Sequence, residues 1–521
     1  MSIHAKSKFS HNLAATMVAF GAHILLGMWY ARMLVTRLGP EQYGIVPLVV
    51  SLMGYLAITT VALNTSIGRH MTASLAAGDR EQASRIGSTA LTGILLLAIP
   101  VFLVGALAYR FLPDLIRVPP GTEPDARLFF AFSLGGFLLT QISIPFGAAT
   151  FCTNRLDWRA GVDLLVYVIR TAGAFLLLVL FGNRLWLVGA AMAVAAGIQL
   201  VFQIRLWRRL LPGISFRPGV FDRVLFKDIF ASGSWITVNA AGALLFLGTD
   251  LVIINRILGP REAGMYAPVL LLSQVTRAIA GSLGNLFTPK ITRLYAEKNL
   301  EGLQAYVVRS TRFLGILMGI PIGLLCALSK DFLTMWMGPL FTDRWPLVWL
   351  LLGHLCINLS VFPQQAVQTA SDRLRVPAMV TLGMGGIHVI LAIVLAGYSG
   401  LGSIGVALSG AIVLTLKNAL FTPAYNMHIL HISARRAFAG MQSSLFTAAV
   451  ALGATAGIHA ILPASGWLRF AGSGVLGVSV TLVTSFLVLL NAQEKEAVLR
   501  PVRRFFRQGP PPGRTVQEEG R

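Results

Sequence analysis

Long apolar stretches recur along this chain from one end to the other, and short polar connections separate them. A hydrocarbon core about 30 Å thick requires about 20 mainly apolar residues in a spanning helix. Stretches of this length predict fourteen transmembrane helices, at 12–38, 43–66, 89–112, 128–151, 160–182, 185–206, 229–257, 263–287, 311–334, 345–369, 378–398, 402–425, 439–462 and 468–491. The pattern therefore predicts an all-α integral membrane protein, in which one long apolar run is divided at Gly400 and Gly402 into the spans 378–398 and 402–425.

The polar connections carry an excess of positive charge, since the 521 residues include 43 Lys and Arg against 21 Asp and Glu. Most of these basic residues fall in alternate connections, on the side that also holds the N-terminus. Because Lys and Arg accumulate in cytoplasmic loops, both termini are expected to be cytoplasmic, in a multi-pass protein of the cell inner (plasma) membrane. We expect this positive charge to interact with anionic lipid headgroups, and we expect no nucleic-acid partner.

Composition and motifs argue against an enzyme. Charged residues make up 12% of the chain, against about 25% in soluble proteins. The sequence contains no zinc-protease motif, nucleophile elbow or phosphate-binding loop, and its connections are short. Four histidines in the apolar stretches, His23, His354, His388 and His459, have no metal-ligand spacing. We therefore expect a transporter without catalytic residues, cofactor or metal.

A short motif occurs twice. Residues 38–44 read LGPEQYG and residues 258–264 read LGPREAG, and each copy ends one long apolar helix and opens the next. Downstream, CTNRLDWRAGVDLLVYVIR from Cys152 is similar to ASDRLRVPAMVTLGMGGIH from Ala370. A repeat of six helices enters the membrane from the same face each time, so the two copies should be parallel lobes related by an axis along the membrane normal. The expected organisation is an N-terminal lobe (1–206), a cytoplasmic linker (207–228), a C-terminal lobe (229–425), two additional helices (426–491) and a cytoplasmic basic tail (492–521).

The segments LGPEQYG, TDLVIINRILGPREAGMYA, QTASDRLRVPAMV and YSGLGSIGVALSGA resemble the polysaccharide-biosynthesis flippases. These belong to the multidrug/oligosaccharidyl-lipid/polysaccharide exporter superfamily. The resemblance implies movement of polyprenyl-diphosphate-linked oligosaccharide units from the inner to the outer leaflet, by alternating access between two lobes. Expected partners are this lipid-linked substrate, membrane lipids, a polysaccharide polymerase and other assembly proteins.

Other interpretations stay open. A peptidoglycan-precursor flippase would have the same fourteen-helix plan, but it usually carries a GAGxxADAF-type segment that LGPEQYG does not match. A cation-coupled small-molecule exporter of the superfamily would have twelve helices and commonly an acidic residue in the first lobe. A membrane glycosyltransferase or polymerase would need grouped catalytic side chains, often on a large outer loop.

Ionisable side chains inside apolar stretches are the main candidates for function, because burying a charge in a membrane is costly. Arg277 lies in the middle of span 8, and the resemblance places spans 1, 2, 7 and 8 around the transport cavity. A guanidinium offers bidentate hydrogen bonds to phosphate. Alternatively, Arg277 pairs with a carboxylate, for which Asp250 in span 7 is the obvious partner. Asp250 is itself a candidate for ion coupling, as an acidic position typical of the family, or for an ion pair.

Six further candidates are weaker. Arg170 lies two helical turns after Asp163 in span 5. Either the two form an ion pair, or Arg170 binds the substrate and Asp163 binds a coupling ion. Arg32, near the outer end of span 1, either snorkels to the interface or lines the cavity. Arg69, just past span 2, either contacts a diphosphate or anchors the helix end. The amides of Gln364 and Gln368 suit sugar hydroxyls and helix–helix hydrogen bonds equally well.

Overall fold

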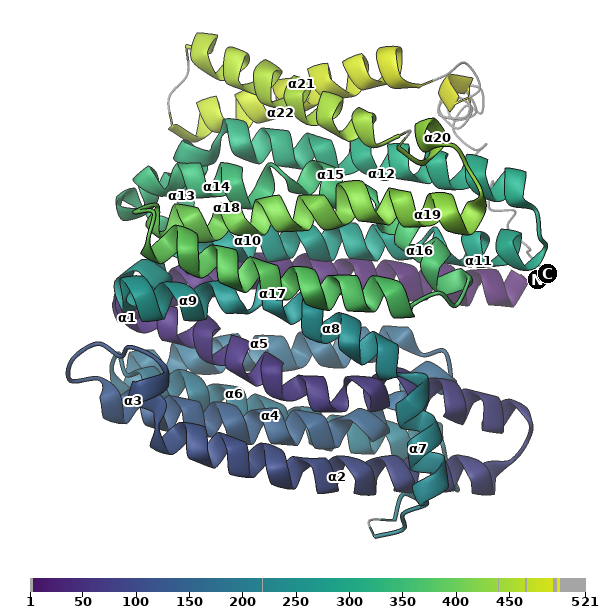
Figure 1. Cartoon of the computed structure of the whole chain (residues 1–521). Coiled ribbons are helices and arrows are strands. Elements are labelled where there is room, and N and C mark those ends of the chain that lie inside the picture. The colour runs from purple at the N-terminus through teal and green to yellow at the C-terminus, as the bar shows by residue number, and fades with distance from the viewer. Residues whose placement is uncertain (1–2, 218, 439, 464–465, 491–493, 497–521) are drawn as a thin grey trace, which may run out of the picture.

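The computed structural model describes residues 3–217, 219–438, 440–463, 466–490 and 494–496, with side chains from residue 16 onward except that of 232. Figure 1 shows a bundle of long helices running roughly side by side, and these ranges contain no strand. Within these ranges eleven helices are long and apolar enough to cross a membrane, or up to twelve if the bent pair Pro339–Ser360 and Phe362–Ala370 is one span. The all-α membrane fold is confirmed. The count of fourteen stays a prediction, because α1 enters that number once and α10 is not among the eleven.

We call helices α1 to α6 the N lobe; they lie in the lower half of Figure 1, except for the first half of α1, which runs behind the middle of the bundle. In the N lobe α4 packs against α6, and α1 packs against α2, α4 and α5. Its elements are α1 (Ile3–Ala76), α2 (Arg80–Arg110), α3 (Leu112–Leu115), α4 (Glu123–Cys152), α5 (Leu156–Phe181) and α6 (Leu185–Leu210).

The C lobe lies above it and begins after the short helix α7 (Arg223–Ser232). Several of its membrane-crossing segments are broken into shorter helices. They are α8 (Ser234–Leu247), α9 (Thr249–Leu258), α10 (Pro260–Asn285), α11 (Thr288–Ala296), α12 (Leu300–Ala327), α13 (Ser329–Met337), the 3-10 helix η1 (Pro339–Arg344), α14 (Trp345–Leu352), α15 (Leu355–Ser360), α16 (Phe362–Ala370), α17 (Arg375–Gly397), α18 (Gly402–Thr415), the π-helix η2 (Leu416–Phe421) and α19 (Thr422–Leu430).

Both copies of the repeated motif make the same turn. Gly39 has φ 78° and ψ 163°, and Gly259 has φ 97° and ψ 173°, a combination that is essentially restricted to glycine. Proline follows each of them. The first turn breaks α1 into two helices, and the second separates α9 from α10. Gly338, also followed by proline, has the same backbone conformation (φ 99°, ψ 173°). We call the end of the bundle that holds these three turns the glycine end.

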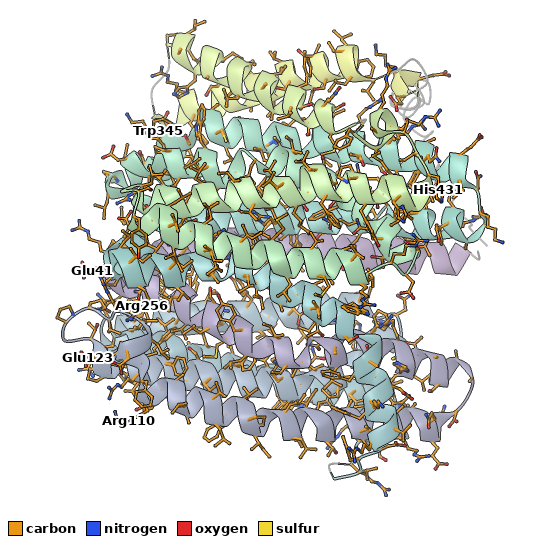
Figure 2. All side chains as sticks on the ribbon, in the orientation of Figure 1. Glu41, Arg110, Glu123, Arg256, Trp345 and His431 are labelled. Carbon is orange, nitrogen blue, oxygen red and sulfur yellow. The ribbon has the colours of Figure 1, made fainter. Side chains whose placement is uncertain are left out.

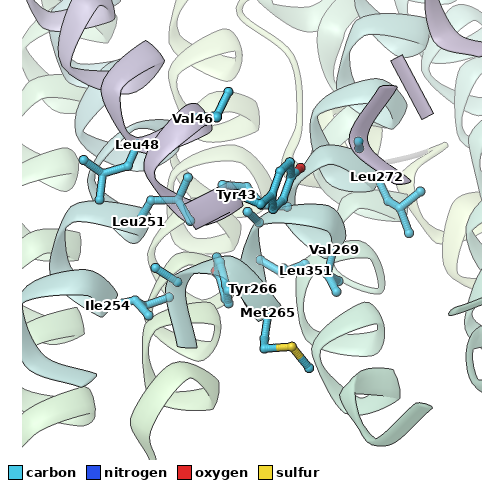
Figure 3. Close-up of a cluster of buried hydrophobic side chains, with 14 of the residues drawn as sticks. Tyr43, Val46, Leu48, Leu251, Ile254, Met265, Tyr266, Val269, Leu272 and Leu351 are labelled. Carbon is cyan, nitrogen blue, oxygen red and sulfur yellow. The ribbon is translucent and has the colours of Figure 1, made fainter. Parts of the chain in front are cut away.

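The two lobes meet through an apolar core close to the glycine end. Figure 3 shows Tyr43, Val46 and Leu48 of α1 beside Leu251 and Ile254 of α9 and several residues of α10. Lipid tails are as apolar as these side chains, so the association of such helices depends on close packing rather than on burial from water. The two lobes therefore make a tight, specific contact at the glycine end.

The connection between the lobes is attached to α2, at the opposite end of the bundle, which we call the linker end. The backbone amides of Arg217, Gly219 and Asp222 donate hydrogen bonds to the hydroxyls of Ser88, Thr92 and Thr89, respectively. Helix α7 then packs on α1 and α2. The linker is therefore part of the N lobe surface rather than a free tether.

The remaining elements, α20 (Ala434–Phe438), α21 (Met441–Ile461) and α22 (Gly466–Leu489), follow the C lobe. Helix α21 packs on α12, where Gly315, Gly319 and Gly323 form a row against it, and α22 packs mainly on α21. They lie on the side of the C lobe away from the N lobe (Figure 1). The predicted basic tail, from residue 492, falls almost wholly outside the described residues.

The ends of the bundle are polar. In Figure 2, Glu41, Arg110, Glu123 and Arg256 lie at the glycine end, and His431 lies at the linker end. Apolar side chains cover the long middle part, as expected for helices in contact with hydrocarbon.

Candidate functional site

A cavity of about 380 Å³ lies between the lobes, and we call it the central cavity. It is enclosed by both halves of α1 together with α5, α8, α9 and α10. Its polar lining consists of Tyr30, Tyr43, Ser51, Tyr167, Arg170 and Gln274, and the rest of its lining is apolar or glycine. Arg170 is the one charged residue among the described residues that line it. A cavity of this size and composition is typical of a small-molecule or headgroup site.

Arg170 has no carboxylate partner among the described residues. Its guanidinium lies 5.6 Å from the ring centre of Tyr30 and 5.7 Å from that of Tyr167, and its buried Nε makes no hydrogen bond. Aromatic faces attract a cation without neutralising it. An unpaired guanidinium in such a place is suited to an anionic group that arrives from outside the protein.

The ion pair considered for Arg170 and Asp163 is not formed. Asp163 instead lies 3.8 Å from Arg159, one turn earlier on α5, and both side chains are about half exposed. A pair at this spacing is favoured because residues four apart are neighbours on a helix surface. Arg170 lies two turns after Asp163 on the same helix and forms no ion pair with it.

Arg69 lies in another cavity of the N lobe, of about 490 Å³, toward the linker end. Arg159 and Asp163 also line it. Arg69 is exposed, and its Nη2 lies 3.4 Å from Ser66 Oγ. Arg69 and Arg170 are therefore both cavity residues, but at different depths.

Arg277 lies on the same helix as Gln274 but outside the lining of the central cavity. Its Nε donates to Ser273 Oγ at 3.3 Å, one turn earlier. Asp250 is close enough to interact with Arg277 electrostatically, although the two form no ion pair. Arg277 thus stands beside the cavity, on the side of the C lobe interior.

Asp250 is occupied by other partners. Its carboxylate accepts a hydrogen bond from the Tyr266 hydroxyl at 2.8 Å and lies 3.0 Å from His388 Nε2, and His388 Nδ1 lies 3.0 Å from Ser409 Oγ. Asp250 is only 4% exposed. The sequence predicts for His388 only the absence of a metal-ligand spacing, because nothing in the positions of His388 and Asp250 indicates that α17 meets α9.

Arg32 contacts the other lobe at the glycine end. Its Nη1 donates to the carbonyl of Met335 at 3.1 Å, and the indole of Trp336 donates to the carbonyl of Met28 at 3.0 Å. Nearby, the side chain of Asn255 forms two hydrogen bonds with the backbone of Arg117. These contacts hold the lobes together at this end of the bundle.

Gln364 and Gln368 lie inside the C lobe and away from the central cavity. Gln364 donates to the carbonyl of Ala437 at 3.2 Å, and Gln368 donates to Asn426 at 3.5 Å. In this arrangement both amides join helices to one another. Within the part of the chain that the structure describes, no group of three His, Cys, Asp or Glu side chains could hold a metal ion.

Solved structures of low sequence identity share this fold. The lipid II flippase MurJ, in an inward closed conformation, matches with a TM-score of 0.63 and 14% identity over 94% of this chain and 99% of MurJ. A mutant of the Vibrio cholerae MATE transporter VcmN matches with a TM-score of 0.57 and 12% identity over 84% of this chain and all of that one. The eukaryotic MATE transporter AtDTX14 matches with a TM-score of 0.57 and 16% identity over 85% of this chain and 98% of that one.

Sequence comparison gives a closer relationship. The chain is 32% identical over 497 residues to the uncharacterized membrane protein EpsK of Bacillus subtilis (strain 168), covering 95% of this chain and 98% of EpsK. The model of the polysaccharide biosynthesis protein family matches residues 8–294, which is more than half of the chain. This protein therefore belongs to the polysaccharide biosynthesis protein family.

Proposed function

We propose that this protein is a flippase that moves polyprenyl-diphosphate-linked oligosaccharide units from the inner to the outer leaflet of the plasma membrane, for the synthesis of a surface polysaccharide. Such a cargo has a lipid-soluble tail and a head that lipid excludes. The protein has to shelter the diphosphate and the sugars while the tail stays in the bilayer. It performs no covalent chemistry on the cargo.

The observation that carries this proposal is the unpaired guanidinium of Arg170 between the two lobes. A cation without a carboxylate partner is costly inside a membrane protein, and a diphosphate supplies the missing charge. A cationic drug would meet repulsion at the same place. The family membership and the fold shared with a lipid II flippase support the same conclusion.

The other candidate residues take secondary roles. Arg69, at the linker end of the N lobe, meets the diphosphate on entry from the cytoplasmic leaflet. Arg277 meets it from the C lobe when the lobes rearrange, and Arg32 belongs to the contacts that close the opposite end. Gln364 and Gln368 keep the C lobe rigid in the conformation described here.

Asp250 is the proposed coupling group. A carboxylate that shares a hydrogen bond with an imidazole can take up and release a proton with little movement of the protein. Tyr266 and Ser409 orient the pair, and the positive charge of Arg277 lies nearby. Proton movement across the membrane would then bias the exchange between the two lobe arrangements.

The test is translocation of fluorescent undecaprenyl-diphosphate-linked N-acetylglucosamine by the purified protein in liposomes. Arg170→Ala should slow translocation by more than about tenfold, since hydrogen bonds to charged groups contribute about 1.5–3 kcal/mol each. Arg170→Lys should retain part of the rate because it keeps the charge but not the planar fork. Arg184→Ala, an exposed arginine at the start of α6, is the control. Wild-type rates in Arg170→Ala would contradict the proposal.

A further inference from the structure

The N lobe contains a chain of connected linings that leads away from the central cavity. Arg170 and Val50 line both the central cavity and a second cavity of about 300 Å³ inside the N lobe. Thr140 and Gln199 line this second cavity and also the cavity of about 490 Å³ at Arg69. We call these two N lobe cavities together the chamber. Each lies within the range of about 300–1,000 Å³ that is usual for ligand pockets.

Most polar side chains that line the chamber are uncharged, although Arg170 lines its smaller cavity and three charged residues line its larger one. Amides reach it from two helices, Gln141 on α4 and Gln199 and Gln203 on α6, and hydroxyls are provided by Thr140 and Ser143. The charged Arg69, Arg159 and Asp163 lie only in the larger cavity. An amide offers two donors and an acceptor, which matches a hydroxyl or an acetamido group better than it matches a phosphate.

Two of these polar groups are buried without a partner. Gln203 is 4% exposed and its Oε1 makes no hydrogen bond, and Ser133, which lines the smaller cavity, is 3% exposed and its Oγ makes none. Leaving a buried donor or acceptor unpaired destabilises the folded protein, so such groups call for an explanation. A ligand with hydroxyl groups would satisfy both.

The amides of the C lobe provide the contrast. The side chains of Gln364 and Asn426 line a cavity of only about 10 Å³, too small for more than a single water. Gln364 donates a hydrogen bond to Ala437 of α20, Gln368 to Asn426, and Asn426 to the carbonyl of Gln364, although Gln364 Oε1 is itself buried without a partner. Buried amides therefore occur in both lobes, but among the described residues the cavity at Gln364 and Asn426 is too small for a ligand, whereas the cavities at the N lobe amides can hold one.

We propose that the chamber binds the glycan of the cargo, with Gln141, Gln199 and Gln203 hydrogen bonding to its hydroxyl and acetamido groups while Arg170 holds the diphosphate. This inference rests on the proposed function and assigns its substrate class, a neutral, hydroxyl-rich oligosaccharide. The amides of the N lobe then form the hydrogen bonds to the sugar, and Arg170 forms the charge contact with the diphosphate. A headgroup that cannot form these hydrogen bonds is discriminated against, because the amides then stay unpaired.

The first experiment compares two lipids in liposomes, undecaprenyl diphosphate with and without N-acetylglucosamine. Gln203→Leu and Gln199→Leu should slow translocation of the sugar-bearing lipid by about tenfold, while the sugar-free lipid moves at the wild-type rate. Gln368→Leu, which removes an amide of the C lobe, should affect both lipids equally. If the chamber variants move both lipids at the wild-type rate, or lose both equally, the chamber does not bind the glycan.

The second experiment needs no transport, so it separates this inference from the proposed function. In a variant without the three native cysteines, Gln199→Cys is modified with a maleimide in the presence of di-N-acetylchitobiose or of inorganic pyrophosphate. The sugar should slow modification several-fold and pyrophosphate should not. Equal modification rates with and without the sugar would overturn the chamber assignment. A wild-type protein that moves neither lipid, combined with protection by the sugar, would overturn the flippase proposal alone.

Discussion

Gly44 and Gly264 are in direct contact across the interface between the two lobes, and each is the last residue of one copy of the repeated motif. A Cβ atom added to Gly44 would lie 2.7 Å from the backbone nitrogen of Gly264, and one added to Gly264 would overlap the carbonyl of Pro40. The two copies of the motif therefore pack against each other, and their glycines allow the two backbones to come into contact. Contacts of this kind are used where membrane helices approach closely.

Gly264→Ala should loosen the glycine end. An extra methyl in such a contact costs about 1–3 kcal/mol, which corresponds to a shift of about 5–150-fold toward arrangements in which the lobes are apart at this end. The measurement is the reaction rate of Gln42→Cys with a membrane-impermeant maleimide, in a background without native cysteines. Gly383→Ala is the matched control, because a Cβ there would have no neighbour within 4 Å. An unchanged rate in Gly264→Ala would show that the lobes do not separate at this contact.

Arg277→Ala should impair glycan export severely in a deletion strain, with the amount of protein in the membrane near normal. Arg277→Lys should impair it in part, because the charge remains and the planar fork does not. Within the described residues the guanidinium forms no ion pair and a long hydrogen bond to Ser273, so it can bind a ligand when the lobes rearrange. Export has to be normalised to membrane protein. Lost export together with lost protein would favour a structural role, and full export would remove Arg277 from the mechanism.

Asp250→Leu should destabilise the protein by about 1–3 kcal/mol for each buried group that loses its hydrogen-bond partner, the Tyr266 hydroxyl and the His388 imidazole. The measurement is thermal unfolding in detergent. Asp163→Leu is the control and should cost about 0–1 kcal/mol, because the Asp163 carboxylate is 42% exposed.

The milder Asp250→Asn keeps an acceptor for Tyr266 but cannot titrate. It should make translocation in liposomes insensitive to an imposed proton gradient. If the gradient still changes the rate of Asp250→Asn, another group carries the proton.

Reporter fusions should place the linker end of the bundle in the cytoplasm. Fusions after Lys227, Arg436 and Asn491 are expected to report the cytoplasm, and a fusion after Pro124 the outside. The physical reason is the retention of Lys and Arg on the cytoplasmic side during insertion. Alkaline phosphatase and green fluorescent protein fusions give opposite signals for the two sides. An outside signal at Lys227 would contradict both the orientation and the parallel repeat.

Much of the fold could be predicted from the sequence because a bilayer permits few solutions. Backbone groups in hydrocarbon have to be satisfied within the segment, so long apolar stretches become helices. The split between α17 and α18 lies at the predicted glycines, and Gly39 and Gly259 make the same turn because only glycine tolerates that backbone conformation. The family relationship was also evident from the repeated motif and its neighbours.

The partners of the buried polar side chains were decided by the tertiary structure. Helical spacing alone permits the pair of Asp163 with Arg159, but only the tertiary structure places Arg170 at the central cavity. Likewise, Asp250 meets His388 from a helix more than a hundred residues away. Gln141 and Gln203 reach one chamber only because α4 packs on α6. Helical periodicity fixes the face on which a residue lies, but not the helix that this face meets. Between membrane helices that choice depends on the fit of small residues and hydrogen bonds over long separations, which single-sequence patterns do not record.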